Sequence, residues 1–166
     1  MKYNGMLLRL PREIRWFIAI FVITLSVGFF SGLFFVEQTS TASPSGIEEN
    51  YLGNEQDVEA EIMIFKKSQR EMLTLIHTHI LSLSMLFFLM GILVWGTRLP
   101  RALKMFLAIE PFLSLILTFG GIYLLWYGIL WMKYLVSFSG MLMTVTYALS
   151  SGLVVFQCLW APKTTH

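Results

Sequence analysis

The chain has 166 residues and a formal net charge of +2; 56% of its residues are hydrophobic and only 13% are charged. Soluble domains carry about 25% charged residues, so this composition excludes an ordinary soluble globular protein. The mean hydropathy is +0.69, and the basic residues lie in short clusters beside apolar stretches, which argues against a nucleic-acid-binding surface. The composition predicts a membrane protein.

Four apolar stretches are long enough to cross a bilayer as helices. About 20 apolar residues span roughly 30 Å of hydrocarbon. The stretches cover residues 16–36, 72–95, 105–127 and 134–160. They do not alternate between polar and apolar residues as barrel strands do. The sequence therefore predicts an all-α membrane protein, a single domain over residues 1–166 with four transmembrane helices in an up-down bundle.

Charged residues are distributed unequally between the two ends of these helices. Lys and Arg accumulate on the cytoplasmic side of membrane proteins. With the N-terminus inside, eight of the twelve basic residues are cytoplasmic and eight of the ten acidic residues are external. Both termini are therefore predicted to be cytoplasmic, with loop 37–71 outside. No organelle signal is visible, so a bacterial inner membrane is the predicted location, and the first apolar stretch is too long for a cleaved signal peptide.

The first and fourth predicted helices carry close-packing patterns. Gly28-x-x-x-Gly32 lies in the first helix and Ala148-x-x-x-Gly152 in the fourth. Small residues four positions apart let another helix backbone approach closely. For the first helix we expect this neighbour to be another helix of the same chain, with a helix of a partner protein as the alternative.

The external loop contains three local signals. Ser43-Pro44-Ser45-Gly46 indicates a turn. Asn54 and the acidic residues after it are typical of a helix start, and Val58, Ile62 and Phe65 form one apolar stripe. We therefore expect a short external amphipathic helix over residues 54–67, before the second span. Ser68-x-x-Glu71 is a capping-box pattern, so the second transmembrane helix is predicted to begin near Ser68.

Two histidines and one carboxyl group fall inside the predicted spans: His77, His79 and Glu110. A titratable group in hydrocarbon costs several kcal/mol unless it is paired or hydrated, so each is a candidate functional residue. The two histidines lie about 200° apart around one helix and do not face a single point. They are predicted at outer-leaflet depth, whereas Glu110 lies toward the cytoplasmic side, next to a kink expected at Pro111.

The histidines suggest a metal or haem site. Imidazole suits Cu, Zn and Fe, and thioethers favour Cu(I). Met141 and Met143 of the fourth helix are expected at the same depth, so the candidate cofactor and metal ligands are His77, His79, Met141 and Met143, with haem b or copper as the bound group. The structural alternative is that one histidine bonds a backbone carbonyl or hydroxyl, while Glu110 is protonated or pairs with Gln157 or an interfacial Arg.

Four-helix haem b proteins are similar to this chain in size and helix count. Those proteins hold the haem between histidines on facing helices. Here the first, third and fourth predicted helices contain no histidine. This departure argues against membership of those families, and a haem held by two histidines would need a second copy or another subunit.

No motif of a hydrolase, a phosphate-binding loop or a nucleotide-binding fold is present, so no enzymatic activity is predicted. The predicted function is a small accessory or assembly subunit of a larger inner-membrane complex, with a respiratory or other redox assembly as the leading context. Its partners would be membrane lipid and other membrane subunits. The alternative is a small transporter or metal-handling protein that uses His77, His79 and Glu110 along a path lined by hydroxyls.

Overall fold

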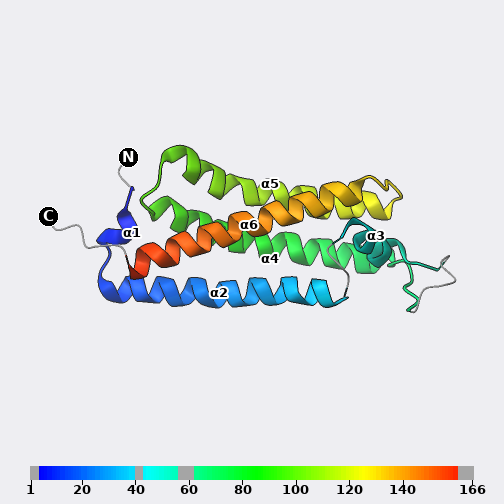
Figure 1. Cartoon of the computed structure of the whole chain (residues 1–166), viewed down its shortest axis with the longest axis horizontal. Helices are drawn as coiled ribbons and strands as arrows, with labels where there is room; N and C mark the ends of the chain where they lie inside the picture. Colours follow the sequence, from blue (N-terminus) through cyan, green and yellow to red (C-terminus); the bar gives the residue numbers. More distant parts are fainter. Residues whose placement is uncertain (1–3, 40–42, 56–61, 161–166) are drawn as a thin grey trace.

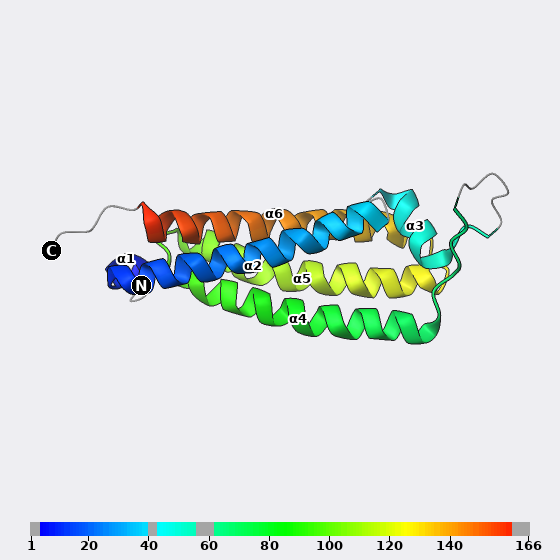
Figure 2. The ribbon, with the colours of Figure 1, turned by 90° about the horizontal axis from the view of Figure 1, so that it is seen from below.

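Four long helices form a bundle, with a short helix at each of its ends (Figure 1). The computed structural model describes residues 4–39, 43–55 and 62–160. The long helices are α2 (Arg12–Thr39), α4 (Gln69–Gly96), α5 (Arg101–Trp126) and α6 (Met132–Leu159), and all four are long and apolar enough to cross a membrane. Successive long helices run in opposite directions (Figures 1 and 2). The predicted all-α class and up-down bundle are confirmed.

Helix α4 begins where the sequence predicts. The Ser68 hydroxyl oxygen accepts a hydrogen bond from the Glu71 backbone N–H at 3.3 Å, and the Glu71 carboxylate accepts one from the Ser68 N–H at 2.7 Å. This reciprocal pair satisfies backbone donors that the first turn of a helix leaves without partners. The predicted capping box is confirmed.

A short helix also precedes α4, but it lies nearer the first span than predicted. Helix α3 covers Pro44–Leu52. Ser43 caps it by accepting a hydrogen bond from the Gly46 N–H at 3.1 Å, and Pro44 occupies the first turn, where its missing N–H has no cost. The segment expected to form only a turn is therefore a helix start.

The helix expected over residues 54–67 is wrong in its described second half, because residues 62–68 are not helical. Val58 lies outside the described residues. The side-chain oxygen of Asn54 accepts a hydrogen bond from the Ile64 N–H at 2.7 Å, and its amide donates to the Ile62 carbonyl at 2.9 Å. Asn54 thus joins two segments of the loop directly after Gly53, whose φ of +81° ends α3.

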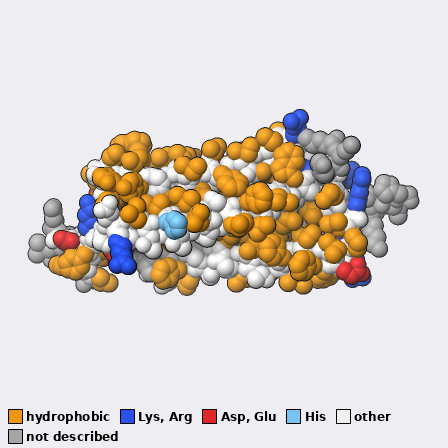
Figure 3. All heavy atoms as spheres, turned by 180° about the vertical axis from the view of Figure 1, so that it is seen from behind, with side chains coloured by type: hydrophobic (Ala, Val, Ile, Leu, Met, Phe, Trp, Pro, Cys, Tyr) orange, Lys and Arg blue, Asp and Glu red, His pale blue; other side chains and the backbone are white. Residues whose placement is uncertain are grey.

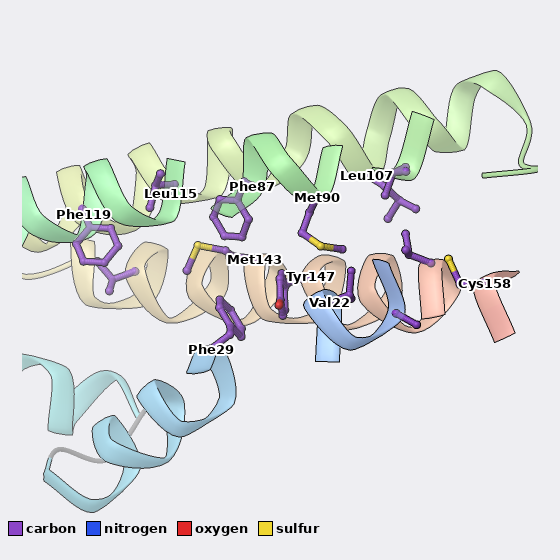
Figure 4. Close-up of a cluster of buried hydrophobic side chains, with 14 of the residues drawn as sticks. Val22, Phe29, Phe87, Met90, Leu107, Leu115, Phe119, Met143, Tyr147 and Cys158 are labelled. Carbon is purple, nitrogen blue, oxygen red and sulfur yellow. The ribbon is translucent and has the colours of Figure 1, made fainter. Parts of the chain in front are cut away.

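The core lies where α4, α5 and α6 face one another, and α2 packs mainly against α6 (Figures 2 and 4). At its centre the ring centroids of Phe29 and Tyr147 are 4.1 Å apart, and those of Phe87 and Tyr147 are 6.3 Å apart. Aromatic pairs at such distances contribute about 0.5–1.5 kcal/mol beyond the area they bury. Phe29 is therefore the residue that ties α2 to the centre of the bundle.

The end of the bundle that holds α3, called the α3 end below, is closed by polar contacts. Lys133 at the start of α6 forms an ion pair with Glu48 of α3 at 2.5 Å. The indole N–H of Trp126 donates to the Lys67 carbonyl at 2.7 Å. Burial raises the pKa of Tyr51 in α3 to about 12. The ion pair joins α3 to α6, the Trp126 bond joins the end of α5 to the segment before α4, and α3 packs across the ends of α5 and α6.

The opposite end, called the termini end, holds the short helix α1 (Met6–Arg9). The Gly5 N–H donates to the Thr97 carbonyl at 3.1 Å, which ties the chain before α1 to the α4–α5 turn. Leu7 of α1 is buried, and it fills the space beside Gly96, where an added Cβ would lie 3.0 Å from the Leu7 side chain. Gly96 therefore provides the close approach that α1 requires.

Candidate functional site

The residues singled out in the sequence lie in two different surroundings. His77 and His79 are exposed side chains on α4. Glu110 on α5 is 6% exposed. The histidines are therefore open to the surroundings of the bundle, whereas the carboxyl group is enclosed by it. The structure does not bring the three titratable side chains together.

His79 is held in one orientation by two contacts. Its Nδ1 lies 2.8 Å from the Leu75 carbonyl oxygen, and because a carbonyl only accepts, Nδ1 carries the proton. The ring stacks on Phe119 of α5, with centroids 5.0 Å apart and planes 26° apart. In the neutral ring the free lone pair is then on Nε2. A backbone carbonyl that accepts from one ring nitrogen is the usual partner of a histidine whose other nitrogen binds a metal.

The two methionines proposed as ligands differ in burial. Met141 is 64% exposed, whereas Met143 is 6% exposed and points into the core beside Phe87 and Tyr147 (Figure 4). The structure thus divides the four candidate ligands, His77, His79, Met141 and Met143, between the surface and the core. Within residues 4–39, 43–55 and 62–160, no group of three or more His, Cys, Asp or Glu side chains is placed to hold a metal ion.

Most of the outer surface is apolar. Figure 3 shows hydrophobic side chains over nearly the whole length of one face, with charged side chains gathered toward the two ends and a histidine within the apolar band. This distribution is that of a protein whose middle is in hydrocarbon and whose ends are at the two interfaces. A ligand at the exposed histidines would therefore be approached from within the membrane.

Glu110 has one satisfied and one unsatisfied carboxyl oxygen. The Ser114 hydroxyl donates to Glu110 Oε1. Oε2 is buried and has no hydrogen-bond partner in the described part of the chain. The pairing with Gln157 considered from the sequence is not formed: Glu110 Oε1 accepts from Ser114 and Oε2 has no partner among the described residues, while Gln157 Oε1 accepts from the Arg98 backbone N–H at 2.7 Å. A buried carboxyl oxygen without a partner is costly, and such an atom indicates a missing ligand or proton.

Small and polar side chains line the contact between α5 and α6. The hydroxyl oxygens of Thr118 and Ser139 lie 2.7 Å apart across it. Near this pair, a Cβ added to Gly121 would lie 2.8 Å from Val136 Cγ2, so the two helices are in close contact. We call the buried polar set here the α5–α6 seam; all its members are at most 7% exposed. It comprises Glu110, Ser114, Thr118, Ser139, Thr146 and Ser150.

The two close-packing patterns found in the sequence do not face this core. Gly28, Gly32 and Gly152 are exposed, and a Cβ added to any of them would have no heavy atom within 4 Å. The expectation that Gly28 and Gly32 pack against another helix of the same chain is therefore wrong. The physical reason is that α2 meets α6 through other residues, such as Val22 and Ser26, the latter lying 3.3 Å from the Tyr147 hydroxyl.

Two buried basic residues at the termini end were not recognised as structural from the sequence. Lys104 is 1% exposed, and its ammonium group donates to the Asn4 side chain at 3.0 Å and to the Trp95 carbonyl at 2.9 Å. Arg15 donates to the Cys158 carbonyl at 2.9 Å and to the Gln157 carbonyl at 3.2 Å. Both side chains donate to carbonyls at helix C-termini. A basic residue one turn inside the neighbouring helix is the sequence pattern that could have predicted this role.

Comparison with known proteins gives one match. A family model described as a transmembrane helical domain matches residues 41–165. This range begins just before α3 and includes α4, α5 and α6, but it leaves out α2. No curated protein and no solved structure matches the chain. The match agrees with the four apolar helices in identifying a multi-pass membrane protein.

Proposed function

The chain belongs to the Aq_1264_TM family of transmembrane helical domains, and on this premise we propose that it is a small accessory or assembly subunit of a larger membrane complex. We infer a non-catalytic role in a bacterial inner membrane, with the termini end on the cytoplasmic side. That end carries the exposed residues Arg9, Arg12, Arg98 and Arg101, as the positive-inside rule requires.

The observation that carries this proposal is the open face of α2. In an apolar 18-residue stretch of α2, only 17% of the residues are buried inside the bundle, whereas 50% are buried in the corresponding stretch of α5. On the open part, Gly28 and Gly32 leave room for a backbone that residues 4–39, 43–55 and 62–160 do not supply. Lipid chains solvate an apolar helix of any shape, whereas glycines four residues apart are the arrangement that lets a second helix come close. We therefore assign this face to a transmembrane helix of another subunit.

The proposed redox context rests on His79. Its Nδ1–H is held by Leu75 and its ring by Phe119, which leaves Nε2 as the free nitrogen. A ring positioned in this way suits an axial ligand of haem b or a ligand of copper contributed jointly with a partner. The transport path from the histidines to Glu110 is less well supported, because His77 and His79 are exposed on α4 whereas Glu110 is buried.

Purification in mild detergent tests the role of α2. The expected result is that the chain carrying Gly28→Leu and Gly32→Leu loses its co-purifying membrane partner, while its own helix content and monodispersity are unchanged. Gly120→Leu is the matched control, because Gly120 is also an exposed helical glycine with nothing within 4 Å and lies on α5. Retention of the same partner by the double variant, or equal loss in the control, would contradict the assignment.

The same purified complex tests the redox context. A Soret band or bound copper that disappears in His79→Ala and persists in His77→Ala would support ligation by His79. A colourless, copper-free complex that still contains its partner would remove the redox context and leave the accessory role standing.

A further inference from the structure

Three oxygen atoms without their ordinary partners occur along the α5–α6 seam. Glu110 Oε2 and Ser150 Oγ are buried and have no hydrogen-bond partner in the described part of the chain. Helix α5 continues through Pro111, and because proline has no N–H, the Leu107 carbonyl lacks its α-helical donor. A hydroxyl in a membrane helix usually bonds a carbonyl of the preceding turn, as Thr146 does with Leu142 at 2.9 Å. Among the seam hydroxyls, Ser150 therefore differs in having no hydrogen-bond partner in the described part of the chain.

The register of the two helices brings these atoms to one level. Thr118 is bonded to Ser139, and α5 and α6 are antiparallel. Eleven residues make about three helical turns and return to the same face. Moving eleven residues toward the termini end from this bonded pair places Leu107 opposite Ser150. Glu110 is then within one turn of that level, on the same buried side of α5 as Ser114, its hydrogen-bond donor.

No described basic side chain neutralises this carboxyl group. On α5, the Lys104 ammonium group donates to the Asn4 side chain and to the Trp95 carbonyl. On α6 the only titratable residue near this level is Tyr147, and its hydroxyl lies 3.3 Å from Ser26 of α2. On α4, which also packs against α5, the titratable residues Arg70, Glu71, His77 and His79 all lie in the half toward the α3 end. The titratable residues of α3, Glu48, Glu49 and Tyr51, lie at the α3 end itself. An ionised Glu110 would therefore be an unpaired charge in hydrocarbon, which costs several kcal/mol.

A carboxylate, a hydroxyl and a backbone carbonyl released from helical bonding are hard oxygen donors. In carrier proteins such groups hold H⁺ or Na⁺ near the membrane midplane at discontinuous helices; in α5 the helix is continuous and only the donor to the Leu107 carbonyl is missing. We propose that Glu110, Ser150 and the Leu107 carbonyl form a site for one exchangeable monovalent cation, a proton or Na⁺, inside the bundle. The site is independent of the partner-binding face on α2, so it stands whether or not the accessory role does.

Labelling with dicyclohexylcarbodiimide, an apolar reagent that reacts with protonated carboxyl groups, tests the site in the full-length protein. The expected result is one adduct per chain by intact mass. Labelling should decrease as the pH rises, because only the protonated carboxyl group reacts. Glu110→Gln should abolish the adduct, whereas Glu13→Gln, which changes an exposed carboxyl at the start of α2, should leave it unchanged. Circular dichroism of each variant verifies that the helices form.

Labelling in the presence of added NaCl or KCl distinguishes Na⁺ from a proton as the bound cation. If added NaCl protects against labelling at constant pH and KCl does not, the site holds Na⁺; if neither salt protects, it holds a proton that exchanges with the medium. Absence of labelling at every pH, equal labelling of the Glu110→Gln chain, or labelling that does not vary with pH would overturn the proposal.

Ser150→Ala tests the second ligand. We expect it to shift the pH of half-maximal labelling or to weaken protection by Na⁺. The matched control is Ser151→Ala, because Ser151 is also buried but its hydroxyl bonds the Ala148 carbonyl at 3.1 Å. Identical profiles for the two alanine variants would remove Ser150 from the site.

Discussion

The α5–α6 seam and the outer face of α2 contain similar residues in opposite surroundings. Both carry small hydroxyl side chains and have glycines beside them. In the seam, Gly121 lies against Val136, and Thr118 is bonded to Ser139. On α2, Gly28 and Gly32 face open space, and the Thr24 hydroxyl bonds the Ile20 carbonyl of its own helix at 2.9 Å.

The difference shows that small residues allow close helix packing but do not determine which helix packs against them. Helix association in membranes depends on van der Waals contact and interhelical hydrogen bonds, because apolar surface is already solvated by lipid. In the seam, both the van der Waals contact and the interhelical hydrogen bond are formed between helices of this chain. On α2 neither is made at the glycine face, so any gain in free energy from packing there must come from another molecule.

The largest effect is expected where the seam is tightest. Gly121→Val should lower the free energy of unfolding by about 1–3 kcal/mol, because the new side chain enters space that Val136 occupies. Gly120→Val, at the adjacent position, should change it by less than about 0.5 kcal/mol because that glycine faces open space. Reversible unfolding in mixed detergent measures both. Equal effects of the two substitutions would show that α5 and α6 are not in close contact at Gly121.

A smaller effect is expected from the hydroxyl pair of the seam. A double-mutant cycle with Thr118→Val and Ser139→Ala should give a coupling free energy of about 0.6 kcal/mol, the average for such bonds between membrane helices. Thr24→Val is the control on α2, since its hydroxyl is bonded only within its own helix. A coupling energy indistinguishable from zero would mean that Thr118 and Ser139 do not contribute as a pair.

At neutral pH the smallest effect is expected at the α3 end, where a change in stability develops only at alkaline pH. Burial raises the pKa of Tyr51 from 10.0 to about 12, so the folded state favours the neutral phenol. The corresponding stability is fully present below pH 10.0 and is lost as the pH rises toward about 12. Tyr51→Phe should therefore reduce the loss of thermal stability over this interval while leaving stability at neutral pH nearly unchanged. An unchanged pH profile would show that Tyr51 is not buried against the bundle.

The elements that the sequence predicted correctly are those with local causes. The spans follow from continuous apolar composition, and the start of α4 follows from the Ser68–Glu71 capping box. The short external helix was predicted in the wrong place because Asn54 has a second use: its side chain bonds the backbone of residues 62 and 64. A helix-start pattern covers only neighbouring residues, so it does not reveal a hydrogen-bond partner of Asn54 that lies more than seven positions away along the chain.

The candidate site was predicted only as a set of residue types. Glu110 was identified because a carboxyl group in an apolar run is unusual. Its alignment with Ser150, inferred from the Thr118–Ser139 pair, depends on the register of α5 against α6, which the sequence does not encode locally. Lys104 was assigned to the cytoplasmic flank because basic residues commonly lie there, yet its side chain bonds the end of α4.

The sequence by itself determined that this protein crosses a membrane four times and that His77, His79 and Glu110 lie within the apolar spans. These properties depend on composition and on the length of each apolar run, and neither requires a neighbour. The tertiary structure alone decided that the histidines are exposed, that Gly28 and Gly32 face outward and that Glu110 is enclosed. Each of these depends on how the helices are rotated and aligned against one another, and that is set by packing between residues far apart in the chain.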